Sequence, residues 1–490
     1  GYSEIGWVRA LGQPTPFPVR ALAGAAPLAL LVAGLVLMFV GYALALRVIG
    51  RVGERARPGL RAILLVALAL ALPLLLLISI PSRDIYSYAM YGRIEAVYDA
   101  DPYSTRPDTF LRDPFLHLVS DRGAVSVYGP AWQVVSRTLV TIAGPDMSAR
   151  TAALGYKTLS LSSLLACAAL IWAILGRLVP SERSRGTWLF ATNPLCLLEL
   201  AGAGHNDGLM MVLVLLAVLA QLRGRTLLAV VSLGAAVLVK WIALLLVPAY
   251  LLWLVRGGFL LRVTRDVLAG GAVVLLLALA LYGRHWNGRQ TFESISGNVA
   301  STRFNNSLAA WAADQIHPAP LDRAPLPPLR ERATLEGEAG LLRERPVTTP
   351  MLSPAQTRLK WGFSLLFAAW ALVLLRRASG MRELMEVWGW TLFAYVCLAA
   401  VWFWPWYVVW VLPFAALSPR SGLARATLLL SATACLVTLR WAAWVASGYD
   451  AAYAPLLVFL PPLGLAAAYL ARLRPAARLR TLAPATGSRK

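Results

Sequence analysis

A few charged and aromatic side chains follow directly behind an apolar run, at a place where a membrane helix would end. The run closes at Ile80, and Arg83, Asp84 and Tyr88 come next. A carboxylate at such a position can take the proton of a hydroxyl, which is the task of a general base in group transfer. Aromatic and charged side chains also gather at membrane interfaces for structural reasons alone. Both interpretations of Asp84 are open on these residues.

Residues 82–150 form a long segment before the next apolar run. Loops of this length are uncommon and are usually functional or disordered. Its many aromatic residues and its turn sequences, Asp101-Pro102-Tyr103 and Tyr128-Gly129-Pro130, argue against disorder. Asp101 either holds substrate hydroxyls or caps the turn at Pro102. Tyr88 and Tyr128 are candidate substrate contacts.

Other ionisable residues interrupt apolar sequence further along the chain. Lys240 lies between two apolar runs, where a charge is costly and faces a cavity or a partner by default; snorkelling at a helix end is the alternative. His205 and Asp207 belong to a Gly-His-Asn-Asp turn, and Asp207 also fits a helix cap. Trp404 lies in an aromatic cluster that either contacts substrate or forms part of an interfacial belt.

Composition indicates an all-α, polytopic membrane protein. The chain has 490 residues, is 58% hydrophobic and carries apolar runs from end to end. We expect about thirteen crossings, some shorter than the ~20 residues that a straight span needs. The expected spans are 24–47, 61–80, 151–176, 187–202, 206–222, 226–240, 241–255, 265–283, 358–375, 384–402, 405–418, 424–446 and 452–471. The four cysteines lie within apolar runs and are expected to be packing residues.

The net charge of +22 is a topology signal, because arginines fill the short connectors between apolar runs. The arginine-rich side is predicted to be cytoplasmic, with the chain in the plasma membrane. Residues 82–150, residues 284–357 and the Trp402–Tyr407 cluster then face outside. This alternation requires that Val127–Gly144 does not cross, so it is predicted to be an interfacial helix whose polar face carries Gln133, Ser136, Arg137 and Thr138. The 284–357 loop is expected to form a partly ordered lid. No nucleic-acid partner is expected.

Three short blocks resemble one family of enzymes. The first combines Arg83-Asp84-Ile85-Tyr86-Ser87-Tyr88 with Gly92-Arg93 and the two turn sequences above; the second is Asn193-Pro194 with Gly204-His205-Asn206-Asp207, and the third is Val239-Lys240-Trp241. In this order they are similar to polyprenol-phosphate-mannose-dependent mannosyltransferases of the GT-C fold, particularly the bacterial alpha-1,6-mannosyltransferases of lipoglycan synthesis.

The resemblance implies a reaction as well as a fold. The family's general base is an aspartate at the start of the first external loop, which matches Asp84. The donor would be a polyprenyl-phosphate hexose, with mannose expected, and the acceptor a glycan or glycolipid hydroxyl. A β-linked donor would give an α-linked product by inversion, with no metal and no cofactor. For the donor phosphate, Lys240 is the first candidate, and Arg303, Arg83 and Arg284 are the others.

The sequence leaves two alternatives for function. An enzyme of the same fold could use polyprenyl-phosphate arabinofuranose or glucose. A transporter or flippase would instead be expected to carry inverted repeats and ionisable residues at the bilayer midplane. The chain contains no P-loop and no Gly-rich nucleotide-binding turn. We expect a catalytic membrane module at 1–283, the long external loop at 284–357, and C-terminal helices with a basic tail at 358–490.

Overall fold

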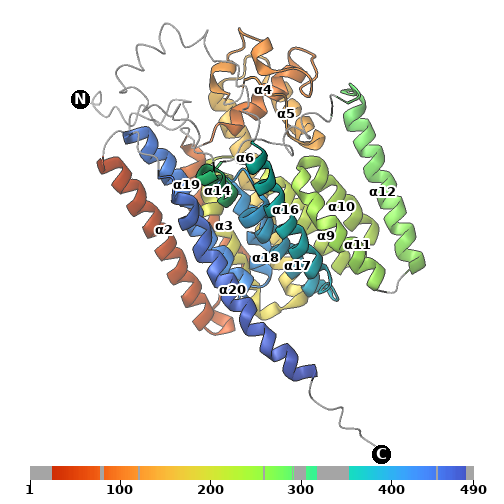
Figure 1. Ribbon diagram of the computed structural model, residues 1–490. Helices are drawn as coiled ribbons and strands as arrows, with labels where there is room; N and C mark the ends of the chain where they lie inside the picture. Colours follow the sequence, from red (N-terminus) through yellow and green to blue (C-terminus); the bar gives the residue numbers. More distant parts are fainter. Residues whose placement is uncertain are drawn as a thin grey trace, which may run out of the picture.

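The computed structural model describes residues 25–77, 82–119, 122–257, 260–289, 291, 305–316, 353–447 and 451–481. These residues form a bundle of helices, as Figure 1 shows. One end of the bundle is covered by α4 (Asp84–Ala96), α5 (Pro130–Ala143) and the segment between them, which together are called the cap. The described residues contain no strand, and a single bridge pairs Asn305 with Trp402. The predicted all-α membrane fold is therefore confirmed.

Six of the described helices are long and apolar enough to cross a membrane, or seven spans if one bent pair is counted. The six are α2 (Ala25–Arg51), α6 (Ala149–Leu178), α12 (Leu260–Gly283), α16 (Pro354–Leu375), α19 (Gly422–Ser447) and α20 (Ala454–Thr481). Every expected span contains helix, but several of the helices are shorter than a full crossing. The expectation of about thirteen crossings stays a prediction.

The other α-helices of the bundle are shorter. They are α3 (Leu60–Leu76), α7 (Arg183–Ala191), α8 (Pro194–Cys196), α9 (Asp207–Leu222), α10 (Thr226–Val239), α11 (Val247–Arg256), α14 (Leu308–Ile316), α17 (Met381–Ala394) and α18 (Leu412–Leu417). Between α8 and α9 the chain makes a π-helix, Leu197–Gly202, and then bends by 116° before α9 begins. The polar residues between Gly202 and Asp207 therefore form a sharp turn between two apolar helical segments.

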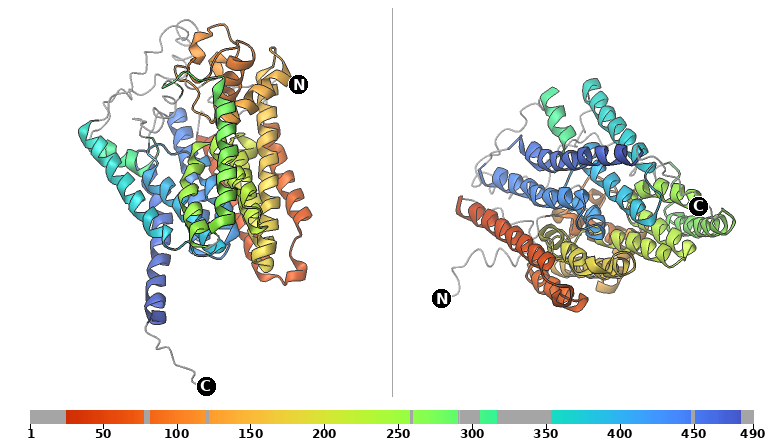
Figure 2. Two further views of the ribbon diagram at one scale, coloured as in Figure 1. Left: turned by 90° about the vertical axis from the view of Figure 1, so that its right-hand side faces the viewer. Right: turned by 90° about the horizontal axis from the view of Figure 1, so that it is seen from below.

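Burial separates central helices from peripheral ones. About half of the apolar stretch of α6 and of α19 is buried (50% and 56%), whereas only 6% of that of α2 or α16 is buried. Figure 2 shows α2 and α12 on the outside of the bundle. A helix that is apolar all round and still uncovered is suited to lipid contact. All four cysteines are buried and unpaired, as expected for packing residues.

A helix forms over the predicted segment, and its four predicted polar-face residues divide: Gln133 and Ser136 face protein, whereas Arg137 is partly exposed and Thr138 is exposed. α5 begins at Pro130, a favoured first helical residue, and packs on α4. Gln133 and Ser136 are only 2% and 1% exposed, while Ile142 is 79% exposed. The prediction that these two residues form a water-facing surface is wrong. Periodicity detects a polar stripe, but it does not tell whether water or another helix covers it.

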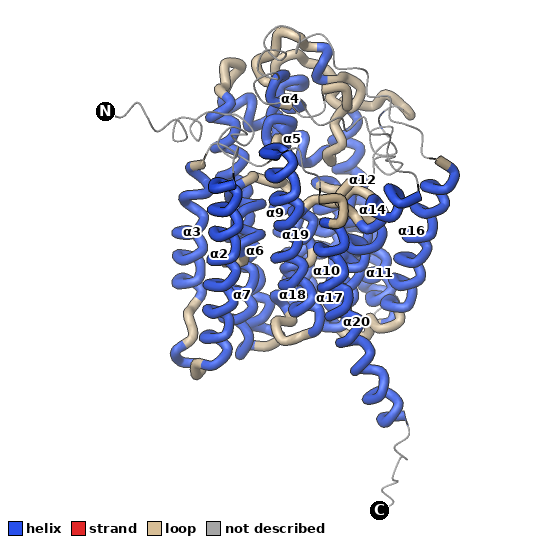
Figure 3. Tube along the Cα trace, turned by 60° about the vertical axis from the view of Figure 1, so that its left-hand side comes forward, coloured by secondary structure: helices blue, strands red, loops and turns tan. Residues whose placement is uncertain are grey.

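The cap and the end of α20 lie at opposite ends of the bundle (Figures 1 and 3). This arrangement matches the expected placement of 82–150 on the face opposite the C-terminus, and the assignment of that face to the outside stays a prediction. The expected lid falls mostly on residues 292–304 and 317–352, which lie outside the described part of the chain.

Candidate active site

Asp84 begins α4 at the junction between the bundle and the cap. Its backbone N–H donates to Ser82 Oγ at 3.2 Å, and Arg83 precedes it as the helix N-cap residue. The first turn of a helix is a favourable place for negative charge because of the aligned peptide dipoles. The Asp84 side chain is 29% exposed, so one side of the carboxylate is open.

His205 lies behind Asp84 and between two carboxylates. Its Nδ1 is 3.6 Å from Asp84 Oδ2, and its Nε2 is 3.2 Å from Glu199 Oε2. The ring is fully buried and stacks on Trp406 with 4.1 Å between the ring centroids. The preceding Gly204 has a φ of +71°, and a Cβ there would lie 2.8 Å from Ile85 Cδ1. A glycine is therefore needed for the turn to approach α4 so closely.

Residues of the same turn contact Lys240, which is the first candidate for binding the donor phosphate. Lys240 Nζ donates to Asp207 Oδ1 at 2.7 Å and lies 3.3 Å from Asn206 Oδ1. The Trp410 indole N–H donates to the same Asp207 oxygen, and Lys240 Nζ lies 5.5 Å from the centre of the Trp410 ring. Three consecutive residues, 205 to 207, thus connect the carboxylate of Asp84 to the ammonium of Lys240.

The Tyr128-Gly129-Pro130 turn packs against the helix end that carries Lys240. The Gly129 N–H donates to Val239 O at 3.2 Å. A Cβ at Gly129 would lie 2.1 Å from Leu238 O, which no other residue could accommodate in this position. Blocks that are far apart in sequence, around 84, 129, 205 and 240, are therefore assembled at one junction of the cap and the bundle.

Several predicted contact residues are buried beneath this junction. Tyr88, His205 and Asp207 are 1%, 0% and 0% exposed. Tyr88 lies edge-on to Tyr128 at 4.7 Å, and burial together with the nearby Asp84 raises the pKa of the Tyr88 phenol well above its usual value. These side chains support Asp84 and Lys240 in this conformation, and their direct contact with substrate stays a prediction.

The other predicted site residues have varied positions. Trp404 is half-buried and stacks on Trp406 at 5.2 Å, so it extends the aromatic surface that covers His205. Arg83 is half-buried beside Asp84. Arg303 lies outside the described residues. The structure does not bring Arg284 to the junction with Lys240: it lies beyond the far end of α4, where its Nη2 is 2.7 Å from Asp99 Oδ1.

Asp101 has the geometry of a turn cap. Its Oδ1 accepts from the Tyr103 N–H at 2.9 Å and its Oδ2 accepts from Ser104 Oγ at 2.7 Å. Asn287 Nδ2 also donates to Oδ2, at 2.9 Å. Of the two roles that the sequence left open for Asp101, these contacts favour capping. They also place it at the opposite end of α4 from Asp84.

Two buried charges close to this junction, Glu199 and Lys157, escaped the sequence analysis. Glu199 contacts His205 from the π-helix, and Lys157 Nζ donates to Leu74 O and Leu77 O at the end of α3, at 2.6 and 2.5 Å. Both interrupt apolar sequence, which is a signal for a functional or structural role in a membrane helix. π-Helical turns are likewise frequent at functional sites. The same reasoning that selected Lys240 would have selected both.

Comparisons with known proteins fit this assembly. The family described as alpha-(1->6)-mannopyranosyltransferase, N-terminal domain, matches residues 6–257, a range that contains Asp84, Gly129, His205 and Lys240. The chain is 30% identical over 245 residues to alpha-(1->6)-mannopyranosyltransferase A of Mycobacterium tuberculosis, covering 47% of this chain and 44% of that protein. It is 29% identical over 191 residues to the protein of the same name from Corynebacterium glutamicum, covering 38% and 37%.

The aligned parts thus span less than half the length of these curated relatives. The family match covers more than half of this chain and includes the three blocks on which the resemblance was based. The predicted resemblance is confirmed, and the chain belongs to the alpha-(1->6)-mannopyranosyltransferase family.

Proposed function

We propose that this protein transfers mannose from a polyprenyl-phosphate carrier to a hydroxyl of a glycan or glycolipid, forming an α linkage. The observation that carries the proposal is the partly exposed Asp84 carboxylate, which contacts the buried His205 and lies at the same junction as the Lys240–Asp207 pair. Family membership and the names of the two relatives support mannose as the sugar and a 1→6 linkage.

In this mechanism Asp84 accepts the proton of the acceptor hydroxyl as its oxygen attacks C1 of the donor sugar. The bond from C1 to the phosphate oxygen breaks, and the electron pair leaves with the polyprenyl phosphate. Displacement from the opposite side turns a β-linked donor into an α-linked product. His205, which contacts Asp84, holds the carboxylate in position.

The leaving phosphate needs cationic stabilisation, because charge builds on it in the transition state. Lys240 is the best placed described cation: an ammonium has three donors, and the contacts with Asp207 and Asn206 take two of them. Its side chain is 21% exposed. Arg83 and Arg303 are the proposed additional contacts.

A lipid carrier fits this site better than a nucleotide sugar. The chain has none of the glycine-rich phosphate-binding motifs of nucleotide-binding domains. Aromatic side chains, among them Trp404 and Trp406, lie beside His205 and border apolar helices. Burial of isoprene units would add about 25 cal/mol per Å² of apolar surface, so the tail would supply much of the donor affinity.

The reaction is tested with purified protein, polyprenyl-phosphate mannose and α-1,6-linked mannooligosaccharides, with products identified by mass and by linkage analysis. We expect one added mannose in α-1,6 linkage. Parallel reactions contain polyprenyl-phosphate arabinofuranose, polyprenyl-phosphate glucose or guanosine diphosphate mannose. Transfer from the nucleotide sugar in the absence of lipid carrier would overturn the proposed mechanism.

We further propose that the cap faces outside the plasma membrane. Single cysteines at Asp108, in the cap, and at Arg478, at the opposite end, are treated with an impermeant thiol reagent on intact cells. Asp108→Cys should be labelled and Arg478→Cys should react only after lysis. The reverse pattern would invert the topology.

A further inference from the structure

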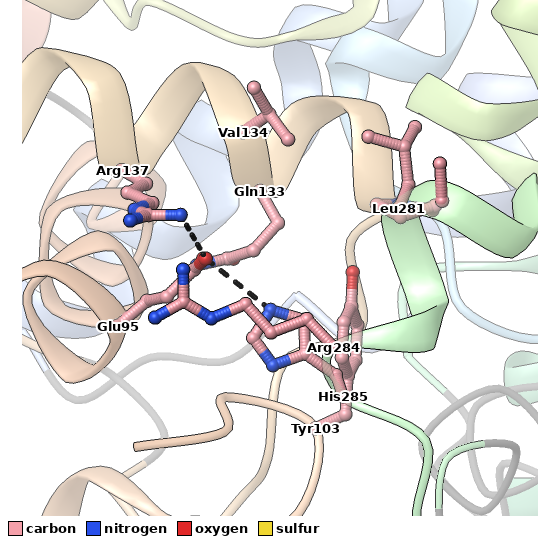
Figure 4. A pocket seen from close by; sticks show the side chains of 10 residues that line it. Glu95, Tyr103, Gln133, Val134, Arg137, Leu281, Arg284 and His285 are labelled. Carbon is pink, nitrogen blue, oxygen red and sulfur yellow. Dashed lines mark hydrogen bonds and ion pairs between the residues drawn. The ribbon is translucent and has the colours of Figure 1, made fainter. Parts of the chain in front are cut away.

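A polar pocket lies at the other end of α4 from Asp84, where the last turn of α4, the start of α5 and the end of α12 meet. Its volume is about 200 Å³. Figure 4 shows Arg137 and His285 both directed at the Glu95 carboxylate. The polar lining consists of Glu95, Tyr103, Gln133, Arg137, Arg284 and His285. Glu95 lies eleven residues after Asp84 on one helix, which separates the two sites by roughly 16 Å.

The charges of this pocket are balanced. Arg137 Nη1 lies 3.2 Å from Glu95 Oε1, and Arg284 Nη2 lies 2.7 Å from Asp99 Oδ1. His285 lies between Glu95 and Asp101, at 3.3 and 3.4 Å. Each guanidinium therefore already faces a carboxylate. A phosphate would find no excess of positive charge here, whereas a neutral ligand would meet donors and acceptors on one wall.

One buried acceptor in the pocket wall, the side-chain oxygen of Gln133, has no donor among the described residues. Gln133 Nε2 donates to Tyr91 O at 2.9 Å, which fixes the orientation of the amide because a carbonyl oxygen can only accept. Gln133 Oε1 is then buried with no hydrogen-bond partner among the described residues. A sugar offers hydroxyl groups that donate, whereas a phosphate diester offers only acceptors. Carboxylates and guanidinium groups also bind sugar hydroxyls.

The remaining walls suit the less polar faces of a sugar ring. Pro130, Val134, Ala280 and Leu281 line the pocket beside the Tyr103 ring. Its volume lies below the ~300–1,000 Å³ of pockets for drug-sized ligands, which limits the occupant to about one ring. We propose that this pocket is a remote acceptor subsite that binds one sugar unit of a glycan chain while a distant hydroxyl of that chain reacts at Asp84. This inference rests on the proposed glycosyltransferase function.

The test compares short and long acceptors in two variants. Arg284→Ala removes a lining cation that is 48% exposed, and Val134→Trp fills the pocket from a position that is 44% exposed. The control is Arg289→Ala, at an exposed arginine that does not line the pocket. Loss of a hydrogen bond to a charged group predicts roughly a tenfold rise in KM for an α-1,6-linked mannopentaose, with unchanged kinetics for the disaccharide.

Binding without donor separates this inference from the proposed reaction. Saturation-transfer NMR of the pentaose should weaken in both variants and persist in Arg289→Ala. Binding with this dependence in a protein that transfers no mannose would keep the subsite and overturn the proposed function. Equal loss for short and long acceptors in a transferring enzyme would overturn the subsite. Competition by inorganic phosphate or anionic-lipid vesicles, without oligosaccharide binding, would also overturn it in favour of an anion site.

Discussion

The two ends of α4 carry the same set of groups, a histidine between two carboxylates, in different surroundings. At the start of the helix His205 lies between Asp84 and Glu199; at the end His285 lies between Glu95 and Asp101. Asp84 is 29% exposed, whereas Asp101 is 14% and Glu95 only 5% exposed. We propose Asp84 rather than Glu95 or Asp101 as the general base because of its greater exposure, since the groups around the two histidines are otherwise alike.

The carboxylates at the two ends of α4 also differ in their partners: Asp101 and Glu95 have more described partners than Asp84. Asp101 already accepts from the Tyr103 backbone, Ser104 and Asn287. Glu95 faces Arg137 and His285. Among the described residues, His205 is the ion-pair partner of Asp84, and the Asp84 side chain is 29% exposed. A group with fewer competing donors is better suited to accept a substrate proton.

The largest expected effect comes from Asp84→Asn, which keeps the shape of the side chain and removes its ability to take a proton. Mannosyl transfer should fall by about 10²–10⁴-fold, or roughly 3–5 kcal/mol of barrier. The comparison variant is Asp101→Asn at the other end of α4, which should stay within about tenfold of the original rate. Turnover by the folded Asp84→Asn protein at the original rate would move the base to another carboxylate.

Lys240→Met should damage both stability and donor use, because it leaves the fully buried Asp207 carboxylate without its cation. Removing one partner of a buried ion pair lowers the free energy of unfolding by about 3–5 kcal/mol. The double variant Lys240→Met with Asp207→Asn removes both charges and should regain most of the thermal stability.

Donor kinetics of the double variant then isolate the role of Lys240 in binding phosphate. If Lys240 contacts the leaving group, KM for the donor stays raised and kcat stays low although the fold has recovered. Recovery of full activity in the double variant would assign Lys240 a structural role alone. Asp207→Asn by itself serves as the control for loss of the carboxylate.

Much of this arrangement was predictable from the sequence. Lys240 was selected because a charge between apolar runs is costly, whereas Asp84 and His205 were selected from their places at the ends of apolar runs and from the family resemblance; the structure brings all three to one junction. Helices also form where apolar runs predicted them. These inferences depend on local sequence and on the cost of burying charge.

The pairing of these residues was not predictable, because it depends on contacts between distant parts of the chain. The Lys240–Asp207 pair joins the ends of two adjacent helices, and the His205–Asp84 contact depends on how the cap sits on the bundle. Glu199 reaches His205 through a π-helix, which sequence periodicity does not reveal. The polar residues Gln133 and Ser136 of α5 face α4 for the same reason: amphipathicity does not identify the neighbour.

A smaller effect is expected from Glu199→Gln, which removes the negative charge behind His205. Loss of a charge-assisted contact of about 1.5–3 kcal/mol predicts a fall in kcat of roughly 10- to 100-fold. Because Glu199 acts through His205, KM for the donor should change little, and the pH profile of kcat should shift. A proportional loss of folded protein, with normal kinetics in what remains, would instead show a purely structural role.

The smallest effect concerns the far end of α4 and the pH dependence of stability. Burial alone would raise the pKa of Glu95, but the donors around it, His285 above all, hold that pKa below its ordinary value of 4.5. A carboxyl whose folded pKa is lowered contributes stability that is complete above its unfolded pKa and is lost as the pH falls through the folded pKa. The difference in thermal midpoint between the original protein and Glu95→Gln should therefore be fully present at about pH 5 and shrink at lower pH. The exposed Glu54→Gln serves as control and should show no such difference. A difference that grew toward acidic pH would mean that the partners of Glu95 do not hold its charge, and the contrast between a fixed carboxylate here and an open one at Asp84 would fail.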